Sequence, residues 1–391
     1  MMSENKIYHG LGNSAMFDEY MDFINYVFGF NGNSHDFKKL LPKLYKPELD
    51  PAGHSYVTVE NGKIKAAVGA YDHDLTVCGE TLKARGIGNV AVHPYERSRG
   101  FMKKLMNLAL EDMVKEGVAM SVLGGRRQRY RYFSFDKLGS RFSMSINDDN
   151  IRHTFGTSFE PCFEFRRVSP DDNESLDGIA KLYGSSLLHC ERPREMLYDI
   201  LVSWQTKVYA AYFKKDGRFA GYFVSDDYSV SEFLIEDVYR PWLPELVRDF
   251  FKYLGKGKLV LCIPLHLSAY IELLIDIGEH YDVAPQKSFN ILDFEKVTRA
   301  FMKLKATYSG LCDGRIVLLI NGYAKEEKLL ISVKDGVPSV EPTDLEPDLE
   351  LSHIEAMNLL FAPFRPERER LPQAPRSWFP LPLFLYSADA V

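Results

Sequence analysis

The sequence predicts a mixed α/β (α+β) chain built from more than one folding unit. Its 391 residues exceed what one ordinary hydrophobic core holds, so two or three domains are expected. Short β-branched runs alternate with amphipathic helical runs, which indicates sheets covered by helices. A two-residue hairpin turn between strand patterns occurs at Asn61-Gly62 and again at Asp216-Gly217, so the first arrangement is predicted to be repeated.

The first unit opens with an aromatic helical stripe and continues with a hairpin. The stripe comprises Met16, Phe17, Tyr20, Phe23, Ile24, Val27 and Phe28. Two glycines and two asparagines in residues 28–34 end this helix. Strands are expected at residues 56–60 and 63–71, on either side of Asn61-Gly62, and a short extended segment at 75–82.

The stretch that organises this unit is a strand at residues 87–92, a loop at 93–100, a helix to residue 116 and a strand at 118–123. One helix face carries Met102, Leu105, Met106, Ala109, Leu110 and Met113. The loop leads into a helix N-terminus, where unpaired backbone N–H groups suit a phosphate. Four basic residues gather there, namely Arg97, Arg99, Lys103 and Lys104. An isolated helix prefers the reverse charge order, so either a polyanion binds here or these side chains point into solvent.

This unit resembles the acetyl-CoA signature of the GNAT superfamily of acyltransferases, Arg/Gln-x-x-Gly-x-Gly/Ala behind a strand. Here Arg97-x-x-Gly100 follows the strand, and Met102 stands at the last position, where the Eis-like (enhanced intracellular survival) branch also carries bulky residues. The resemblance implies a GNAT domain over residues 1–150 and a role for the Val92 N–H as oxyanion donor. It implies acetyl-CoA contacts for Val90, Ala91, Val92, Arg97, Ser98, Arg99, Gly100, Phe101 and Met102.

Residues 151–285 are predicted to form a second, degenerate copy of this domain. Strands are expected at 208–214, 218–224, 233–238 and 258–263, with a helix at 243–254. Where the first copy has its glycine loop, residues 238–244 carry two prolines and no glycine, so a phosphate cannot approach the backbone in the same way.

Residues 286–391 resemble the sterol-carrier-protein-like domain that closes Eis-type chains. Strands are expected at 289–293, 316–320 and 329–333, and helices at 294–304 and after the capping box Ser352-x-x-Glu355. Six prolines between Pro363 and Pro382 predict an extended, stiff tail, and its large apolar residues predict docking onto the body. Such a tail would hold Val391 at a fixed place; packing for stability alone is the alternative.

The resemblance also indicates the catalytic groups. Tyr130-x-x-Phe133-Ser134-Phe135 resembles a family segment, Tyr-x-x-x-Gly-Phe, whose tyrosine acts as the acid toward the thiolate, although Ser134 replaces the usual glycine; Tyr132 is the fallback. The alternative is that both tyrosines are structural. Many GNAT enzymes use a glutamate as base, but Asn89 lies in that region, and an amide cannot accept the proton. The Eis-like branch instead uses its C-terminal carboxylate, which here belongs to Val391.

Arg126, Arg127, Arg129 and Arg131 form a basic run around Tyr130. They would serve the 3′-phosphate of the coenzyme, an acidic partner or solubility alone, and the last is preferred. The net charge of −6 argues against a nucleic-acid partner. No apolar run reaches the roughly 18 residues that span a membrane, so no membrane partner is expected. The five scattered cysteines predict neither disulfides nor a metal site and favour the cytoplasm.

These observations predict an acetyl-CoA-dependent N-acetyltransferase that works by direct transfer in a ternary complex. The expected acceptor is a primary amine on a lysine or on a small molecule such as a polyamine or an aminoglycoside. Homo-oligomerisation is a further implication of the resemblance. Two alternatives stay open, namely a non-catalytic acyl-CoA-binding sensor or carrier and an enzyme that transfers a longer acyl group.

Overall fold

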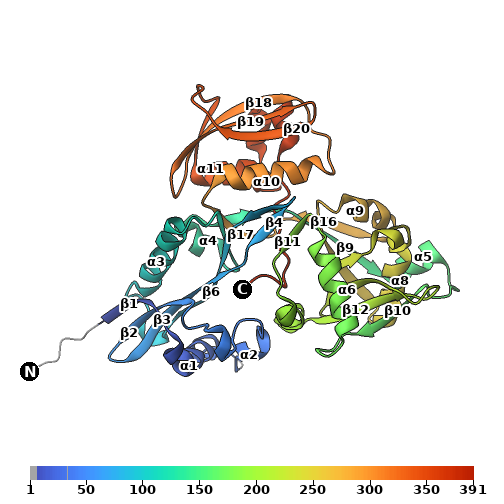
Figure 1. Cartoon of the computed structure of the whole chain (residues 1–391), viewed down its shortest axis with the longest axis horizontal. Coiled ribbons are helices and arrows are strands. Elements are labelled where there is room, and N and C mark those ends of the chain that lie inside the picture. The colour runs from blue at the N-terminus through green and yellow to red at the C-terminus, as the bar shows by residue number, and fades with distance from the viewer. Residues whose placement is uncertain (1–6, 33) are drawn as a thin grey trace, which may run out of the picture.

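The structure, a computed structural model, describes residues 7–32 and 34–391. Figure 1 shows three lobes, each built on its own sheet, with the C-terminal end of the chain between them. Of the helices in this described part, none is long and apolar enough to cross a bilayer. The mixed α/β fold class predicted from the sequence is confirmed.

The first lobe contains a seven-stranded sheet in the order β1-β2-β3-β6-β7-β17-β8. Its strands are β1 (Ile7–Leu11), β2 (Ser55–Glu60), β3 (Lys63–Asp72), β6 (Ala84–Val92), β7 (Met120–Leu123), β17 (Lys287–Ile291) and β8 (Asp136–Leu138). Its helices are α1 (Phe17–Gly29), α2 (Phe37–Leu40), α3 (Phe101–Lys115) and α4 (Arg127–Tyr130). Helix α3 packs on one face, and α1 and α2 pack on the other. The β2–β3 turn has positive φ at Asn61 and Gly62, as its sequence predicts.

The second lobe repeats this sheet strand for strand, in the order β10-β12-β13-β14-β15-β9-β16. Its strands are β10 (Phe163–Arg167), β12 (Lys207–Phe213), β13 (Phe219–Ser225), β14 (Ser229–Ile235), β15 (Lys258–Pro264), β9 (Arg141–Asn147) and β16 (His280–Ala284). Its helices are α5 (Asp148–Phe155), α6 (Asn173–Gly184), α7 (Leu197–Val202), α8 (Leu243–Leu254) and α9 (Ser268–Leu274). In each sheet the fourth and fifth strands are parallel and the other neighbours antiparallel, so the lobes share one topology.

The two sheets exchange one strand. Strands β8 and β9 follow one another in sequence, as do β16 and β17, yet β17 pairs with β7 and β8, while β9 pairs with β15 and β16. Strand β9 lies before residue 150 but belongs to the sheet of the second lobe, and β17 lies after residue 285 but belongs to the sheet of the first lobe. The sheets therefore do not follow the predicted sequence boundaries. The division into 1–150, 151–285 and 286–391 stays a prediction. A small sheet, β11-β4-β5, also joins the two lobes through β11 (Leu188–Cys190), β4 (Leu75–Val77) and β5 (Glu80–Leu82).

The third lobe is a four-stranded sheet in the order β20-β19-β18-β21 with two longer helices. Its strands are β18 (Gly314–Asn321), β19 (Glu326–Lys334), β20 (Val337–Pro342) and β21 (Leu349–Ser352), and its helices are α10 (Phe294–Ala306) and α11 (His353–Phe361). The expected capping box opens α11, where the Ser352 N–H donates to Glu355 at 2.9 Å. The likeness of this lobe to a sterol-carrier domain stays a prediction.

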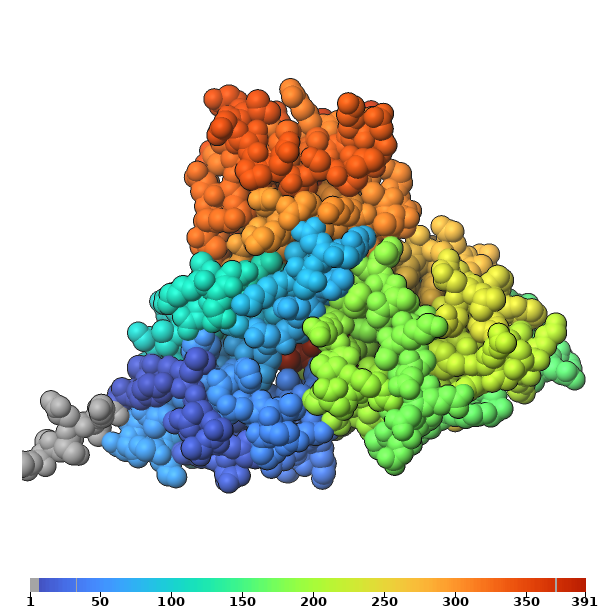
Figure 2. All heavy atoms as spheres, viewed as in Figure 1, coloured from blue at the N-terminus to red at the C-terminus, as the bar shows by residue number. Residues whose placement is uncertain are grey.

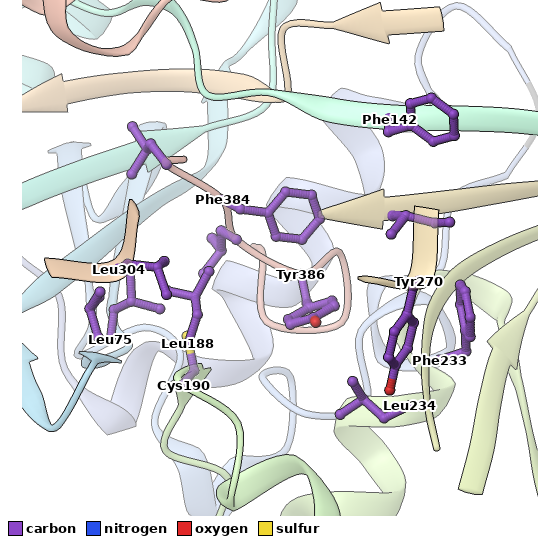
Figure 3. Packing of buried hydrophobic residues seen from close by; sticks show 14 of the residues in the cluster. Leu75, Phe142, Leu188, Cys190, Phe233, Leu234, Tyr270, Leu304, Phe384 and Tyr386 are labelled. Atoms are coloured by element: carbon purple, nitrogen blue, oxygen red, sulfur yellow. The ribbon is translucent and has the colours of Figure 1, made fainter. Parts of the chain in front are cut away.

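The tail after α11 is not extended throughout, so that prediction was wrong. Residues 366–370 form a 3₁₀ turn, and α12 (Gln373–Trp378) is a short helix. Pro375 lies in the first turn of α12, where a missing N–H breaks no intrahelical bond, so proline is tolerated there. Beyond Trp378 the chain has no regular helix or strand and is deeply buried. Figure 3 shows Phe384 and Tyr386 packed among side chains of the surrounding lobes.

Candidate active site

A strand edge opens where the parallel strands β6 and β7 separate. Their pairing runs from Ala84 opposite Met120 to Ile87 opposite Leu123, where β7 ends. β6 continues to Val92, paired only with β3 on its other side. Because the His93 N–H donates to the Lys65 carbonyl at 2.9 Å on that β3 side, strand alternation turns the Val92 N–H toward the open edge.

A bulge shapes the same strand. Gly88 pairs with Gly69 and Ala91 with Ala67, so β6 carries one residue more than β3 across this interval. Asn89 provides the bulge with φ +48°, a conformation that asparagine adopts more readily than most residues. Its side chain is buried, and Nδ2 has no partner within the described residues. Asn89 thus shapes the backbone in the region where the family resemblance would place a catalytic glutamate.

A groove of about 780 Å³ lies along this edge and the start of α3. Seven of the nine residues predicted to contact the coenzyme line it, namely Val90, Val92, Arg97, Ser98, Gly100, Phe101 and Met102. Ala91 instead faces the cluster on the α1 side of the sheet. Arg99 turns to Glu60, with contacts of 2.8 and 2.9 Å, and to Glu96 at 2.6 Å. Its guanidinium holds the pKa of the Glu60 carboxyl below its usual range.

The N-terminus of α3 supplies the donors expected of an anion site. Gly100 is the N-cap, with φ +80°, a region that residues with a Cβ rarely adopt. The Lys104 N–H donates to the Gly100 carbonyl at 3.1 Å, so the N–H groups of the three residues between have no acceptor within the helix. Backbone donors and the positive helix end therefore face the groove together.

The arginine run of residues 126–131 divides between two roles. Arg126 and Arg129 line the groove together with Arg97 and Lys103. Arg127 instead makes a bidentate pair with the fully buried Asp136, which holds the pKa of Arg127 above its usual value. The groove thus has four cations that suit a molecule with several phosphates.

The two candidate acids differ in surroundings. Tyr130 is 7 % exposed, and its ring lies against Gly125, where a Cβ would overlap it. Burial raises the pKa of Tyr130, opposed by the nearby Arg129, so the phenol stays protonated at neutral pH. Tyr132 is 64 % exposed, lines the groove and lies under Lys103, with 4.9 Å between Nζ and the ring centroid. Tyr130 is the better shielded of the two.

The tail brings Val391 to β6, on the α1 side of the sheet. A Cβ at Gly86 would overlap Cγ2 of Val391, and a Cβ at Gly88 would lie 3.6 Å from its carboxyl carbon. Val391 lines two cavities, one of about 340 Å³ with Trp204 and Lys287, and one of about 210 Å³ with Lys43. Figure 2 shows the dark red end of the chain inside a hollow where the lobes meet.

A buried charge cluster holds the tail in place. Arg192 donates to Glu232 at 2.7 and 2.8 Å and to Asp389 at 2.7 and 2.9 Å. These three side chains are at most 3 % exposed. Tyr183 also donates to Asp389, at 2.8 Å. Lys43 donates to the carbonyls of residues 388 and 390, and burial lowers the pKa of its ammonium to about 7.

Sequence reasoning missed these anchoring residues. Arg192 and Asp389 are 197 positions apart, and no local pattern signals their pairing. Lys287 carried no signal either, since it lies in an ordinary strand pattern. The available clue was the apolar tail, which predicted docking without identifying its partners.

Comparisons with known proteins agree with this geometry. Residues 11–136 match the family model described as an acetyltransferase (GNAT) domain. No curated protein matches the chain at a significant level.

Several solved structures share the fold over most of the chain. Eis1 from Mycobacterium abscessus is 15% identical with a TM-score of 0.63, and 97% of this chain and 98% of that chain are covered. A GCN5-related N-acetyltransferase from Anabaena variabilis is 14% identical with a TM-score of 0.64, with the same coverage of 97% and 98%. Another from Kribbella flavida is 18% identical with a TM-score of 0.61, covering 91% and 88%. At these identities the likeness shows the fold alone, in which the sheet of the matched region is followed by a second sheet of the same topology.

Proposed function

We propose that the chain is an acetyl-CoA-dependent N-acetyltransferase that transfers an acetyl group directly to a primary amine on a small molecule or a lysine. The observation that carries the proposal is the open edge of β6 between Ile87 and Val92, beside a groove that ends at the N-terminus of α3. A strand edge binds an extended amide-containing arm, and a helix N-terminus binds phosphate. The match of residues 11–136 to a GNAT domain supports the same assignment.

The groove residues fit the coenzyme. The pyrophosphate is assigned to the free N–H groups of Phe101, Met102 and Lys103, and the 3′-phosphate to the cations along the groove. The strand backbone of Val90 and Val92 is assigned to the pantetheine arm. Gly100 leaves the entrance open, because a side chain there would project beside the phosphates.

Three groups are assigned to the chemistry. The Val92 N–H stabilises negative charge that develops on the thioester oxygen. The Val391 carboxylate orients the acceptor amine and accepts its proton directly or through water. The Tyr130 phenol, protonated at neutral pH, returns a proton to the departing thiolate. The proton lost by the amine and the proton gained by the thiol balance the reaction.

Thiol release from acetyl-CoA against a panel of polyamines, aminoglycosides, amino acids and lysine peptides tests the proposal. Amine-dependent release with formation of the N-acetyl product is the expected result. Tight acetyl-CoA binding without release for any amine would favour the non-catalytic sensor. Absence of acetyl-CoA binding in calorimetry would refute the assignment of the groove.

Two variants separate the two halves of the site. Gly100→Glu should abolish acetyl-CoA binding, because it places a carboxylate beside the phosphate donors and strains the αL cap. Gly86→Ala should lower kcat with little change in acetyl-CoA affinity, because its Cβ displaces Val391. Gly184→Ala is the matched control, since it also adds a Cβ but meets no atom within 4 Å and has no left-handed φ. Unchanged kcat in Gly86→Ala would exclude Val391 from the mechanism.

The third lobe is assigned a sterol-carrier-like fold, supported by its four-stranded sheet and by α10 and α11 beside it. Its role in this proposal is to support the tail, since Trp378 donates to the Cys312 carbonyl at 2.9 Å and Lys305 to the Pro380 carbonyl at 3.0 Å. The five cysteines are free thiols, which supports a reducing cytoplasm as the place of the reaction.

A further inference from the structure

The larger of the two cavities at Val391 contains a lysine without a partner. Lys287 lies on β17, the strand exchanged into the first sheet, and lines this cavity of about 340 Å³. Within residues 7–32 and 34–391, no hydrogen bond or ion pair engages its ammonium. Partial burial lowers the pKa of this group to about 8, so it is still mainly protonated at pH 7. An ammonium removed from water without a partner is costly, so a ligand that supplies an anion is favoured here.

The charges around Lys287 do not neutralise it. Lys137 on β8 and Arg141 on β9 are the cations whose charge acts on it most, and Lys43 lies near enough for the two ammonium groups to affect each other. Asp389 is the carboxylate whose charge acts on it most, but both oxygens of Asp389 are already bonded to Arg192 and Tyr183. Asp389 therefore makes no hydrogen bond to Lys287, and the charges of Lys137 and Arg141 oppose its effect.

The opposite charge needed by an amine is present at the same cavity. Val391, whose carboxylate the proposed function uses, lines it, and its backbone carbonyl carbon lies against Gly88 of β6. No ion pair joins this carboxylate to Lys287 among the described residues, so the two charges remain separate. The other lining residues are Val122, Leu123, Gly124, Trp204, Ser387 and Ala390. The cavity thus combines one carboxylate and one free ammonium in a mainly apolar wall.

We propose that the acceptor is a small zwitterion, a primary amine that also carries a carboxylate, phosphate or sulfonate, with Lys287 binding that anionic group. The inference rests on the proposed acetyl transfer and specifies its substrate class. The ammonium of the acceptor meets the Val391 carboxylate, and its anion meets the Lys287 ammonium. The volume of about 340 Å³ lies at the small end of ligand pockets, which favours a compact molecule over an aminoglycoside. A polyamine leaves Lys287 unpaired and adds further positive charge.

Matched acceptor pairs that differ only in the anion test this specificity. Suitable pairs are β-alanine with β-alaninamide, phosphoethanolamine with ethanolamine, and lysine with cadaverine. In at least one pair, we expect kcat/KM to be about tenfold higher or more for the anionic member than for the uncharged one, because a hydrogen bond to a charged group contributes a free energy of this size. In Lys287→Met this preference should vanish, because KM for the anionic member rises to that of the uncharged member. Lys63→Met, which removes an exposed lysine outside the cavity, is the control and should keep the preference.

A binding measurement separates this inference from the acetyl transfer. Trp204 lines the cavity, so its fluorescence should change when the anionic amines are titrated without acetyl-CoA, and Trp204→Phe should remove the change. If no amine is acetylated, the proposed function fails, and Lys287-dependent binding still decides the inference. The inference would be overturned if both members of every pair bound equally well. An equal loss of affinity for both members in Lys287→Met would also overturn it. Lys287→Gln, which keeps a polar end, replaces the Met variant if that variant does not fold.

Discussion

Replacing Asp389 by asparagine should release the tail without touching the coenzyme groove. Asp389 accepts bonds of 2.7 and 2.9 Å from Arg192 and one of 2.8 Å from Tyr183, and its side chain is 3 % exposed. The guanidinium keeps both bonds to Glu232, so its charge is not left wholly unpaired. Removing one partner of a buried ion pair costs about 3–5 kcal/mol, and we expect about 3 kcal/mol, the low end, because Glu232 remains.

The functional effect should be larger than the loss of stability suggests. Lys43 also holds residues 388 and 390, and Trp204 of the second lobe donates to the Ala390 carbonyl at 3.3 Å, but Asp389 makes the tail's charged contact with that lobe. Without it, Val391 should leave Gly86 and Gly88, and kcat should fall about tenfold or more at unchanged acetyl-CoA affinity. Urea unfolding, steady-state kinetics and calorimetry on the same preparation measure the three quantities.

A matched control distinguishes anchoring from a general loss of charge. Asp227 also pairs with a cation, Lys207, and accepts a tyrosine hydroxyl, that of Tyr209 at 2.9 Å, but it is more exposed than Asp389. Asp227→Asn should cost less stability and leave kcat unchanged. Full turnover in Asp389→Asn, or an equal loss of acetyl-CoA affinity, would refute the anchoring argument.

Three further outcomes are expected. Ser134→Gly should raise the free energy of unfolding by up to about 1 kcal/mol in urea titrations, because Ser134 has φ +63°. An unchanged or lower free energy of unfolding would contradict a strained backbone at this residue. His353 accepts from the Tyr323 N–H and lies 2.8 Å from Asn290, and burial lowers its pKa from 6.5 to about 4. The unfolded chain thus binds a proton between pH 6.5 and 4 that the folded chain does not, so this group costs up to about 3 kcal/mol as pH falls through that window. His353→Gln should flatten this slope in urea titrations at several pH values, and an unchanged slope would assign it to other groups. Extending the chain by one glycine beyond Val391 should slow turnover with acetyl-CoA affinity unchanged, and a fully active extended chain would contradict the assigned role of the carboxylate.

Local signals accounted for those parts of the site that are built from neighbouring residues. The Asn61-Gly62 turn, the strand to Val92 and the loop into α3 lie where their patterns predicted, because turn chemistry and hydrophobic periodicity act over a few residues. Ser134 shows why a glycine stands at that position in the family segment, since its backbone is left-handed. The prolines predict an extended chain at residues 373–378, yet α12 forms there, because Pro375 lies in its first turn, where proline breaks no intrahelical hydrogen bond.

The sequence by itself determined the repeated α/β arrangement, the loop at Gly100 that leads into α3, and an apolar tail that must dock. Only the tertiary structure decided the exchange of β9 and β17, the pairing of Arg192 with Asp389, and the placement of Lys287 and Val391 on one cavity. These arrangements bring together residues more than a hundred positions apart, or select one of two equally patterned strands. Sequence periodicity reports which face of an element is buried but not which distant element covers it, because many partners satisfy the same pattern.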